Sequence, residues 1–307
     1  MSAMRKMLFS VVTVLLCAAC LHAVAPAKFD SNRAYEDMRQ LVAIGPRVAG
    51  TPGAVAARAY ITKQLQAAGL KVEEQPFEAT TPLGRVKMVN LRAILPASGA
   101  GQSAPRLVIG GHYDTKLFRE FTFVGANDGG SSAAFLIELG RALKSRTNPV
   151  PIELLFLDGE EAVGEWQGTD HTYGSRYYVE AARKAGTLKD IRAFVLVDMI
   201  GDRDLVIKRE ANSTRALTNA IWDAAHRLGR REFVNETTPI EDDHLEFLEA
   251  GVPAVDIIDL EYATRTGEVA WHSKYDTLEN VAAGSLQAVG DVVLAALPAL
   301  EAFGSRH

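Results

Sequence analysis

Ionisable side chains follow several apolar stretches of this sequence that have the length of strands. His112 and Asp114 come after one such stretch, Glu160 and Glu161 after a second, and Asp198 after a third. The carboxyl ends of parallel strands lie at one edge of a sheet, where ligands bind in open α/β folds. We therefore expect these side chains to converge. So many carboxylates would repel one another unless a cation neutralised them.

Two further residues extend this set. Asp128 begins the helix expected after the first strand, and His272 closes the loop that follows residues 254–258. Zinc accepts histidine nitrogen and carboxylate oxygen together and leaves a coordination position for substrate, so the sequence predicts a zinc site. Taken singly, Asp128 could cap a helix, and adjacent Glu160 and Glu161 could be solvated surface residues. Only the combination indicates a metal.

Predicted strands and helices alternate along the chain. Strand-length apolar runs lie at residues 88–95, 106–110, 152–157, 193–197, 205–208 and 254–258. Helical patterns lie at residues 31–46, 54–68, 131–143, 175–185, 214–228, 244–250 and 278–303. Several strands consist almost entirely of Val, Ile, Leu and Phe, which is typical of strands covered on both faces. The pattern predicts a single three-layer α/β/α domain with a mixed, mainly parallel central sheet.

The composition is that of an ordinary globular protein. Of 307 residues, 48% are hydrophobic and 23% are charged, which is enough apolar material for one large core. The net charge of −5 arises from 38 acidic and 33 basic residues that are mixed along the chain. The sequence therefore predicts no basic face of the kind that would indicate nucleic acid as a partner.

The N-terminal segment differs in kind from the rest. Arg5 and Lys6 precede an apolar run over residues 7–21, and Ala25-Pro26-Ala27 offers a cleavage site. This layout predicts a secretory signal over residues 1–27 and an exported protein, either periplasmic or secreted. The apolar run, at roughly 15 residues, is short for a membrane span, although an uncleaved anchor is the alternative.

Both cysteines lie in this segment, so the mature chain would have no disulfide and no catalytic thiol unless Cys20 is retained. Residues 15–20 resemble a bacterial lipoprotein signal in which Cys20 would be lipidated, but Cys17 stands where that motif prefers leucine. A lipid anchor at Cys20 is the one membrane association that we infer from the mature sequence.

Five motifs occur in the order seen in the M28 zinc aminopeptidase superfamily. They are His112-Tyr113-Asp114-Thr115-Lys116, Gly125-Ala126-Asn127-Asp128, Asp158-Gly159-Glu160-Glu161-Ala162, Val197-Asp198-Met199-Ile200-Gly201 and Trp271-His272. The similarity extends from about residue 31 to the C-terminus, which implies a zinc catalytic domain over residues 31–307.

Within that superfamily the sequence resembles the animal-type glutaminyl cyclases. A peptidase typically reaches its Gly-Ser helix start soon after the paired glutamates, whereas here residues 162–173 intervene and contain Trp166. The segment Glu241–Leu248, followed by Gly251-Val252-Pro253, resembles a second cyclase signature. Trp271 before the histidine matches the cyclase pocket.

The resemblance implies a zinc-dependent glutaminyl-peptide cyclotransferase, an acyltransferase that converts the N-terminal Gln of a peptide substrate to pyroglutamate and releases ammonia. One zinc ion would be held by three ligands, Asp128, Glu161 and His272. Glu160 would be the catalytic acid/base, with a pKa raised toward neutrality.

Four further residues have roles implied by the same resemblance. Asp198 and Asp242 would form a carboxylate pair that shares a proton, because adjacent carboxylates resist ionising together. Trp166 and Trp271 would line the substrate pocket and exclude water.

Two alternatives remain open. A di-zinc M28 aminopeptidase would use the same side chains, with Asp128 bridging the ions and with His112 and Asp198 completing a second metal site. Asn127 before Asp128 and the glycines after it look peptidase-like, whereas Trp166 and its insertion favour a cyclase. A non-catalytic zinc-fold binding module is the other alternative, but it would be expected to lack the acid/base or a ligand.

Overall fold

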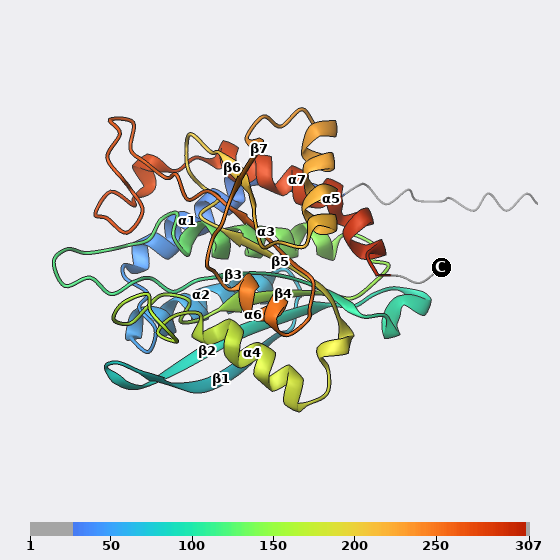
Figure 1. Cartoon of the computed structure of the whole chain (residues 1–307), viewed down its shortest axis with the longest axis horizontal. Coiled ribbons are helices and arrows are strands. Elements are labelled where there is room, and N and C mark those ends of the chain that lie inside the picture. The colour runs from blue at the N-terminus through green and yellow to red at the C-terminus, as the bar shows by residue number, and fades with distance from the viewer. Residues whose placement is uncertain (1–26, 305–307) are drawn as a thin grey trace, which may run out of the picture.

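A six-stranded sheet runs through the centre of the computed structural model, which describes residues 27–304 (Figure 1). Its strands, in spatial order, are β1 (Val72–Thr81), β2 (Gly84–Leu95), β4 (Ile152–Leu157), β3 (Arg106–His112), β5 (Ile191–Asp198) and β8 (Ala254–Ile258). The predicted signal sequence, including Cys20, lies outside the described residues.

Three of the five strand pairings in this sheet are parallel. β4 pairs with β3, β3 with β5 and β5 with β8 in parallel, whereas β1 pairs with β2 and β2 with β4 in antiparallel fashion. The mixed, mainly parallel sheet predicted from the sequence is confirmed.

Helices cover both faces of the sheet. They are α1 (Ser31–Ile44), α2 (Pro52–Ala67), α3 (Gly130–Lys144), α4 (Tyr173–Lys184), α5 (Arg215–Arg227), α6 (His244–Glu249) and α7 (Ala283–Ala302). Side chains of α1, α2, α3, α5 and α7 belong to the large hydrophobic cluster on one face. α4 and α6 belong to a smaller cluster on the opposite face. The result is the predicted three-layer α/β/α arrangement.

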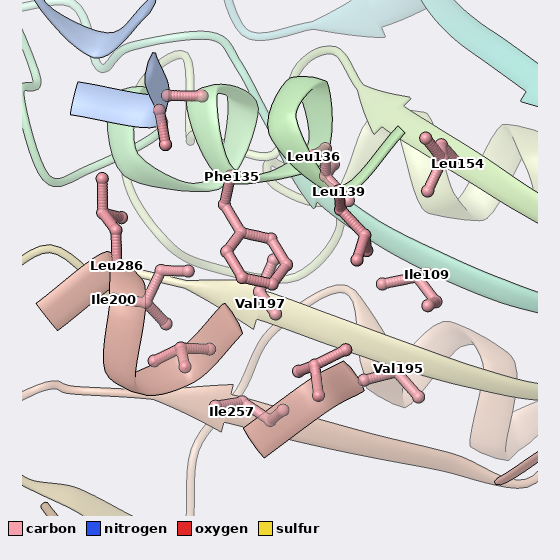
Figure 2. Packing of buried hydrophobic residues seen from close by; sticks show 14 of the residues in the cluster. Ile109, Phe135, Leu136, Leu139, Leu154, Val195, Val197, Ile200, Ile257 and Leu286 are labelled. Carbon is pink, nitrogen blue, oxygen red and sulfur yellow. The ribbon is translucent and has the colours of Figure 1, made fainter. Parts of the chain in front are cut away.

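The central strands bury side chains on both faces, as their continuous apolar sequences predict. On β5, Val195 and Val197 join the large cluster, while Phe194 and Leu196 between them join the smaller one. Figure 2 shows Phe135 of α3 pointing toward Val197 within the large cluster. This two-sided burial fixes the strand ends and hence the loops that carry the polar residues.

Two parts of the sheet structure differ from the sequence prediction. β1 was not predicted, because it is an edge strand rich in charged residues and contains Pro76, both typical of sheet edges. The strand expected near residues 205–208 is β6 (Ile207–Glu210), which lies outside the central sheet. It pairs in parallel with β7 (Phe233–Thr238), which was also not predicted, in a separate two-stranded sheet.

Within the described part of the chain, α7 is the one helix that is long and apolar enough to cross a membrane by length and composition. Its most apolar 18-residue window is 56% buried inside the fold. Leu286, Val289 and Val293 lie in the large hydrophobic cluster. The helix therefore serves as a core helix of this domain.

The four parallel strands end at the same edge of the sheet. His112 at the end of β3 lies in register with Leu157 at the end of β4, and Asp198 at the end of β5 lies beside Ile258 of β8. The turns that follow these strands consequently face one another, as the sequence analysis expected.

Arg47 holds the long loop between β3 and α3. Its side chain is fully buried, and its guanidinium donates hydrogen bonds to the carbonyl oxygens of Tyr113, Val124 and Gly125 at 2.9, 2.6 and 2.8 Å. Burial lowers the pKa of Arg47 to about 10, so the guanidinium stays protonated at neutral pH. One side chain thus ties together both ends of the loop that leads to Asp128.

We expect Arg47→Met to lower the free energy of unfolding by about 3 kcal/mol or more, because each buried carbonyl left unpaired costs on the order of 1–3 kcal/mol. Urea denaturation followed by circular dichroism measures the change. Arg39→Met is the matched control, since Arg39 is exposed and, within residues 27–304, pairs with Glu36 alone. Equal stability of the two variants would contradict the structural role of Arg47.

Candidate metal centre and active site

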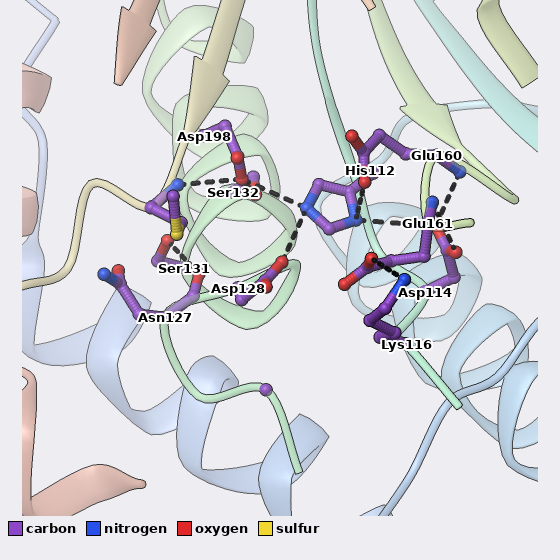
Figure 3. Close-up of polar contacts among 12 residues, drawn as sticks. His112, Asp114, Lys116, Asn127, Asp128, Ser131, Ser132, Glu160, Glu161 and Asp198 are labelled. Atoms are coloured by element: carbon purple, nitrogen blue, oxygen red, sulfur yellow. Dashed lines mark hydrogen bonds and ion pairs between the residues drawn. The ribbon is translucent and has the colours of Figure 1, made fainter. Parts of the chain in front are cut away.

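A cavity of about 450 Å³ opens at the carboxyl edge of the sheet. Its wall includes eight residues singled out in the sequence: Asp128, Glu160, Glu161, Trp166, Asp198, Asp242, Trp271 and His272. His112 is the exception. It is 1% exposed and does not line the cavity, but lies in the polar network beneath it, between Asp128 and Asp198 (Figure 3).

Asp128, Glu161 and His272 form one group that could hold a metal ion. Nε2 of His272 lies 3.3 Å from Oδ2 of Asp128 and 3.2 Å from Oε1 of Glu161, and the three candidate ligand atoms lie within 4.8 Å of one another. Oδ2 of Asp128 and Oε2 of Glu161 are buried without a hydrogen-bond partner. Buried polar atoms normally have partners, so this donor set fits a cation.

A second group overlaps the first at Asp128. Nε2 of His112 lies 3.2 Å from Oδ1 of Asp128 and 3.0 Å from Oδ1 of Asp198, and these three residues could also hold a metal ion. The two carboxylate oxygens of Asp128 thus face different histidines, and Figure 3 shows the contact with His112. The geometry contains the ligand sets of both the one-metal and the two-metal hypothesis.

Local backbone contacts position the two glutamates after β4. The backbone N–H groups of Glu160 and Glu161 donate to the two carboxylate oxygens of Asp114 at 3.2 and 3.3 Å. Gly159 adopts φ +71°, and a Cβ there would lie 2.5 Å from Sδ of Met88. Glycine adopts this φ without strain and leaves room for Met88, so it suits the turn.

Glycine and a distant aspartate position Asp128 in a similar way. Gly129 has φ +74°, and a Cβ there would lie 2.3 Å from the carbonyl oxygen of Asp114. The backbone N–H groups of Asn127 and Asp128 donate to Asp276 at 2.7 and 3.0 Å. The peptidase-like glycine after Asp128 therefore has a packing reason, and Asp276 is a supporting residue that the sequence analysis missed.

Burial makes Glu160, the predicted acid/base, easier to protonate than an exposed glutamate. Burial raises the pKa of Glu160 well above its ordinary value; His112 opposes this shift, and the charges of Asp242 and Glu161 add to it. Burial also raises the pKa of Glu161 to about 7, with Asp128 contributing. The cavity thus carries more carboxylates than its own cations can neutralise, and a divalent ion would relieve this imbalance.

Asp198 and Asp242 come from different elements and meet at the cavity. Oδ1 of Asp198 accepts from the backbone N–H of Met199 at 2.8 Å, while Oδ2 of Asp242 is buried without a hydrogen-bond partner. Burial raises the pKa of Asp242 well above its ordinary value, and the charge of Asp198 contributes. The two carboxyl groups are close enough to interact, and their shared proton stays a prediction.

Aromatic rings form the sides of the cavity. Trp166 stacks on His171 with ring centroids 4.3 Å apart, and its Nε1 donates to Oε2 of Glu241 at 3.1 Å. Trp271 stacks on His272 with centroids 4.4 Å apart.

Two phenylalanines also contact His272. The rings of Phe118 and Phe123 meet its imidazole edge-on, with centroids 5.9 and 6.1 Å away. The sequence analysis missed both residues, as it missed His171. The aromatic run after the first motif was the available signal for the phenylalanines.

The sequence of this chain is similar to those of proteins in a known family. The model of peptidase family M28 matches residues 90–297. The glutaminyl-peptide cyclotransferase-like protein of Mus musculus is 31% identical over 274 residues, covering 80% of this chain and 69% of that protein. The glutaminyl-peptide cyclotransferase of Boiga irregularis is 32% identical, covering 76% and 72%.

A solved structure agrees with these relatives. The crystal structure of an Acidobacteriales bacterium glutaminyl cyclase superposes with a TM-score of 0.85 at 39% identity, covering 91% of this chain and 97% of that one. The resemblance seen in the sequence is confirmed, and the chain belongs to peptidase family M28, among its glutaminyl-peptide cyclotransferase members.

Proposed function

We propose that this chain is a zinc-dependent glutaminyl-peptide cyclotransferase, which converts the N-terminal Gln of a peptide to pyroglutamate and releases ammonia. The relatives with this activity in their names support the reaction class. The observation that carries the proposal is a single cavity. It combines the buried acid/base Glu160, a metal-binding group and two tryptophan walls.

Zinc would be held by Asp128, Glu161 and His272. Two carboxylates and one imidazole leave a position open for substrate, as in catalytic zinc sites. Zinc bound there would polarise the side-chain amide oxygen of the substrate as a Lewis acid.

The chain's own groups would move the protons. In cyclisation, the α-amine nitrogen bonds to the side-chain amide carbon, and the bond from that carbon to the amide nitrogen breaks. Glu160 would take a proton from the attacking amine and deliver it to the amide nitrogen, which leaves as ammonia. Asp198 and Asp242 would hold a shared proton beside this path.

Trp166 and Trp271 would restrict water, which competes by hydrolysing the amide. Trp271 is 38% exposed, so it stands at the opening of the cavity, whereas Glu160 is only 6% exposed. The reacting atoms would then lie on the inner side of the aromatic walls.

The direct test is to incubate purified protein with a peptide that begins with Gln and to weigh the product. Loss of ammonia with every peptide bond intact is the expected result. Release of free Gln would instead indicate an aminopeptidase. A chelator should abolish turnover, and a non-catalytic binding module would show no turnover to abolish.

The second candidate function is a di-zinc aminopeptidase, and the group of His112, Asp128 and Asp198 favours it. We predict one zinc ion per chain, because a cyclase needs Asp198 beside Asp242 rather than on a second ion. His112→Ala should then leave the zinc content nearly unchanged. Elemental analysis after loading with a modest excess of zinc measures the zinc content per chain of the wild type and of His112→Ala. Two tightly bound ions together with release of free Gln would make the aminopeptidase the better proposal.

We further propose that the protein acts after export, on periplasmic or secreted peptides or proteins. The charged start, apolar run and small residues of segment 1–27 support this. Lipidation of Cys20 would tether the enzyme to a membrane, and mass spectrometry of the mature N-terminus distinguishes a tethered from a free form.

A further inference from the structure

The cavity has a buried interior and an acidic mouth. Asp128, Glu160 and Asp242 are 3%, 6% and 4% exposed, whereas Glu165 and Glu241 on the same wall are exposed. The carboxylates of the interior and those of the mouth therefore face different parts of any bound peptide.

The proposed reaction fixes which part of the peptide lies where. The N-terminal Gln must lie in the interior, because its α-amine has to reach Glu160. Asp242 offers this interior an unpartnered buried oxygen, as expected for a site built to receive a ligand. The rest of the peptide then extends toward the mouth, whose wall includes Glu165 and Glu241.

Glu241 is held in place before any substrate arrives. Its Oε2 accepts from Nε1 of Trp166 at 3.1 Å, and Trp166 is stacked almost parallel on His171, at 6° between the ring planes. A carboxylate fixed in this way loses less conformational freedom on binding a partner than a free side chain would.

Among the described residues, no cation pairs with the two glutamates of the mouth. Neither Glu165 nor Glu241 forms an ion pair with another residue of the described range 27–304. Lys116 also lines the cavity, but its Nζ donates to the carbonyl oxygen of Ala162 at 3.2 Å and lies 3.9 Å from Glu161. The negative charge of the mouth is therefore available to a ligand.

We propose that Glu165 and Glu241 select substrates whose second residue is Lys or Arg. This inference rests on the proposed function, since it uses the position of the N-terminal Gln. A long cationic side chain would reach the two carboxylates, while an acidic second residue would be repelled by them. Such a site would favour peptides and proteins that begin with Gln-Lys or Gln-Arg.

The test compares kcat/KM for three peptides that begin with Gln-Lys, Gln-Ala and Gln-Glu and are otherwise identical. At about 0.01 M salt we expect Gln-Lys to exceed Gln-Glu roughly tenfold, because each exposed charge contact contributes roughly two- to fivefold and two carboxylates act together. At about 1 M salt the ratio should fall toward one.

Glu241→Gln should reduce the Gln-Lys to Gln-Glu ratio to about threefold or less, and Glu165→Gln with Glu241→Gln should bring it close to one. The side-chain oxygen retained in Glu241→Gln can still accept the Trp166 hydrogen bond, so the change removes charge rather than shape. Glu249→Gln is the charge-matched control, because Glu249 is exposed and does not line the cavity. It should keep the wild-type ratio.

Two results would overturn the proposal: a wild-type ratio within twofold of one, or a ratio that survives removal of both carboxylates. Absence of cyclisation with all three peptides would instead contradict the proposed function. In that case calorimetry can still measure whether the mouth binds the Gln-Lys peptide more tightly than the Gln-Glu peptide. Equal dissociation constants for these two peptides would then contradict the proposed selectivity.

Discussion

Glu160→Gln is expected to retain the metal and to lower kcat about 10²- to 10⁴-fold, the usual contribution of general acid/base catalysis. The amide keeps the shape of the side chain but cannot carry a proton between the amine and the leaving nitrogen. The backbone N–H of Glu160 donates to Asp114, a contact that the substitution preserves. The loss should therefore report chemistry rather than misfolding.

Ammonia release from a Gln-peptide measures the rate, and elemental analysis measures the zinc. Glu249→Gln makes the same chemical change on an exposed surface and should behave as wild type. A near wild-type rate for Glu160→Gln would rule Glu160 out as the acid/base. Loss of zinc in this variant would show that Glu160 acts through the metal site instead.

His272→Ala is expected to strip zinc from the purified protein and to reduce turnover to background. His272 supplies the only nitrogen of the proposed ligand group, and its removal leaves two carboxylates that repel each other. Its backbone adopts φ +51°, a conformation that is uncommon outside glycine and that often marks a functional position.

The fold should survive this change, because the hydrophobic clusters on the two faces of the sheet do not include His272. The thermal unfolding of His272→Ala should match that of chelator-treated wild type, while the zinc per chain after dialysis should fall to near zero. His226→Ala on α5 is the control, since His226 is exposed and distant in sequence from every proposed ligand. Full zinc occupancy in His272→Ala would show that the ligand assignment is wrong.

The sequence determined the elements of the fold where the local pattern was strong. The bounds of β4 and β8 agree with the predicted runs 152–157 and 254–258, because strands buried on both faces are continuously apolar. β1 escaped prediction because an edge strand carries charges and proline that resemble a loop. The predicted runs 106–110 and 193–197 located β3 and β5, although these strands continue to His112 and Asp198.

The tertiary structure alone decided which of these residues meet. The sheet order brings the segments after β3, β4, β5 and β8 to one edge, so that His272 from the loop after β8 meets Asp128 and Glu161. No local pattern encodes strand order, because it follows from long-range packing of helices on both faces.

The same holds for the residues that support the site. Asp276 lies 148 residues from Asp128 in sequence yet accepts its backbone N–H, and Glu241 lies 75 residues from the Trp166 indole that fixes it. A carboxylate in a sequence is usually a solvated surface group. In the folded chain, Asp276 is a buried hydrogen-bond acceptor, whereas Glu241 lies at the mouth of the cavity. The sequence could not distinguish these two roles, because burial and position both depend on chain segments far apart in sequence.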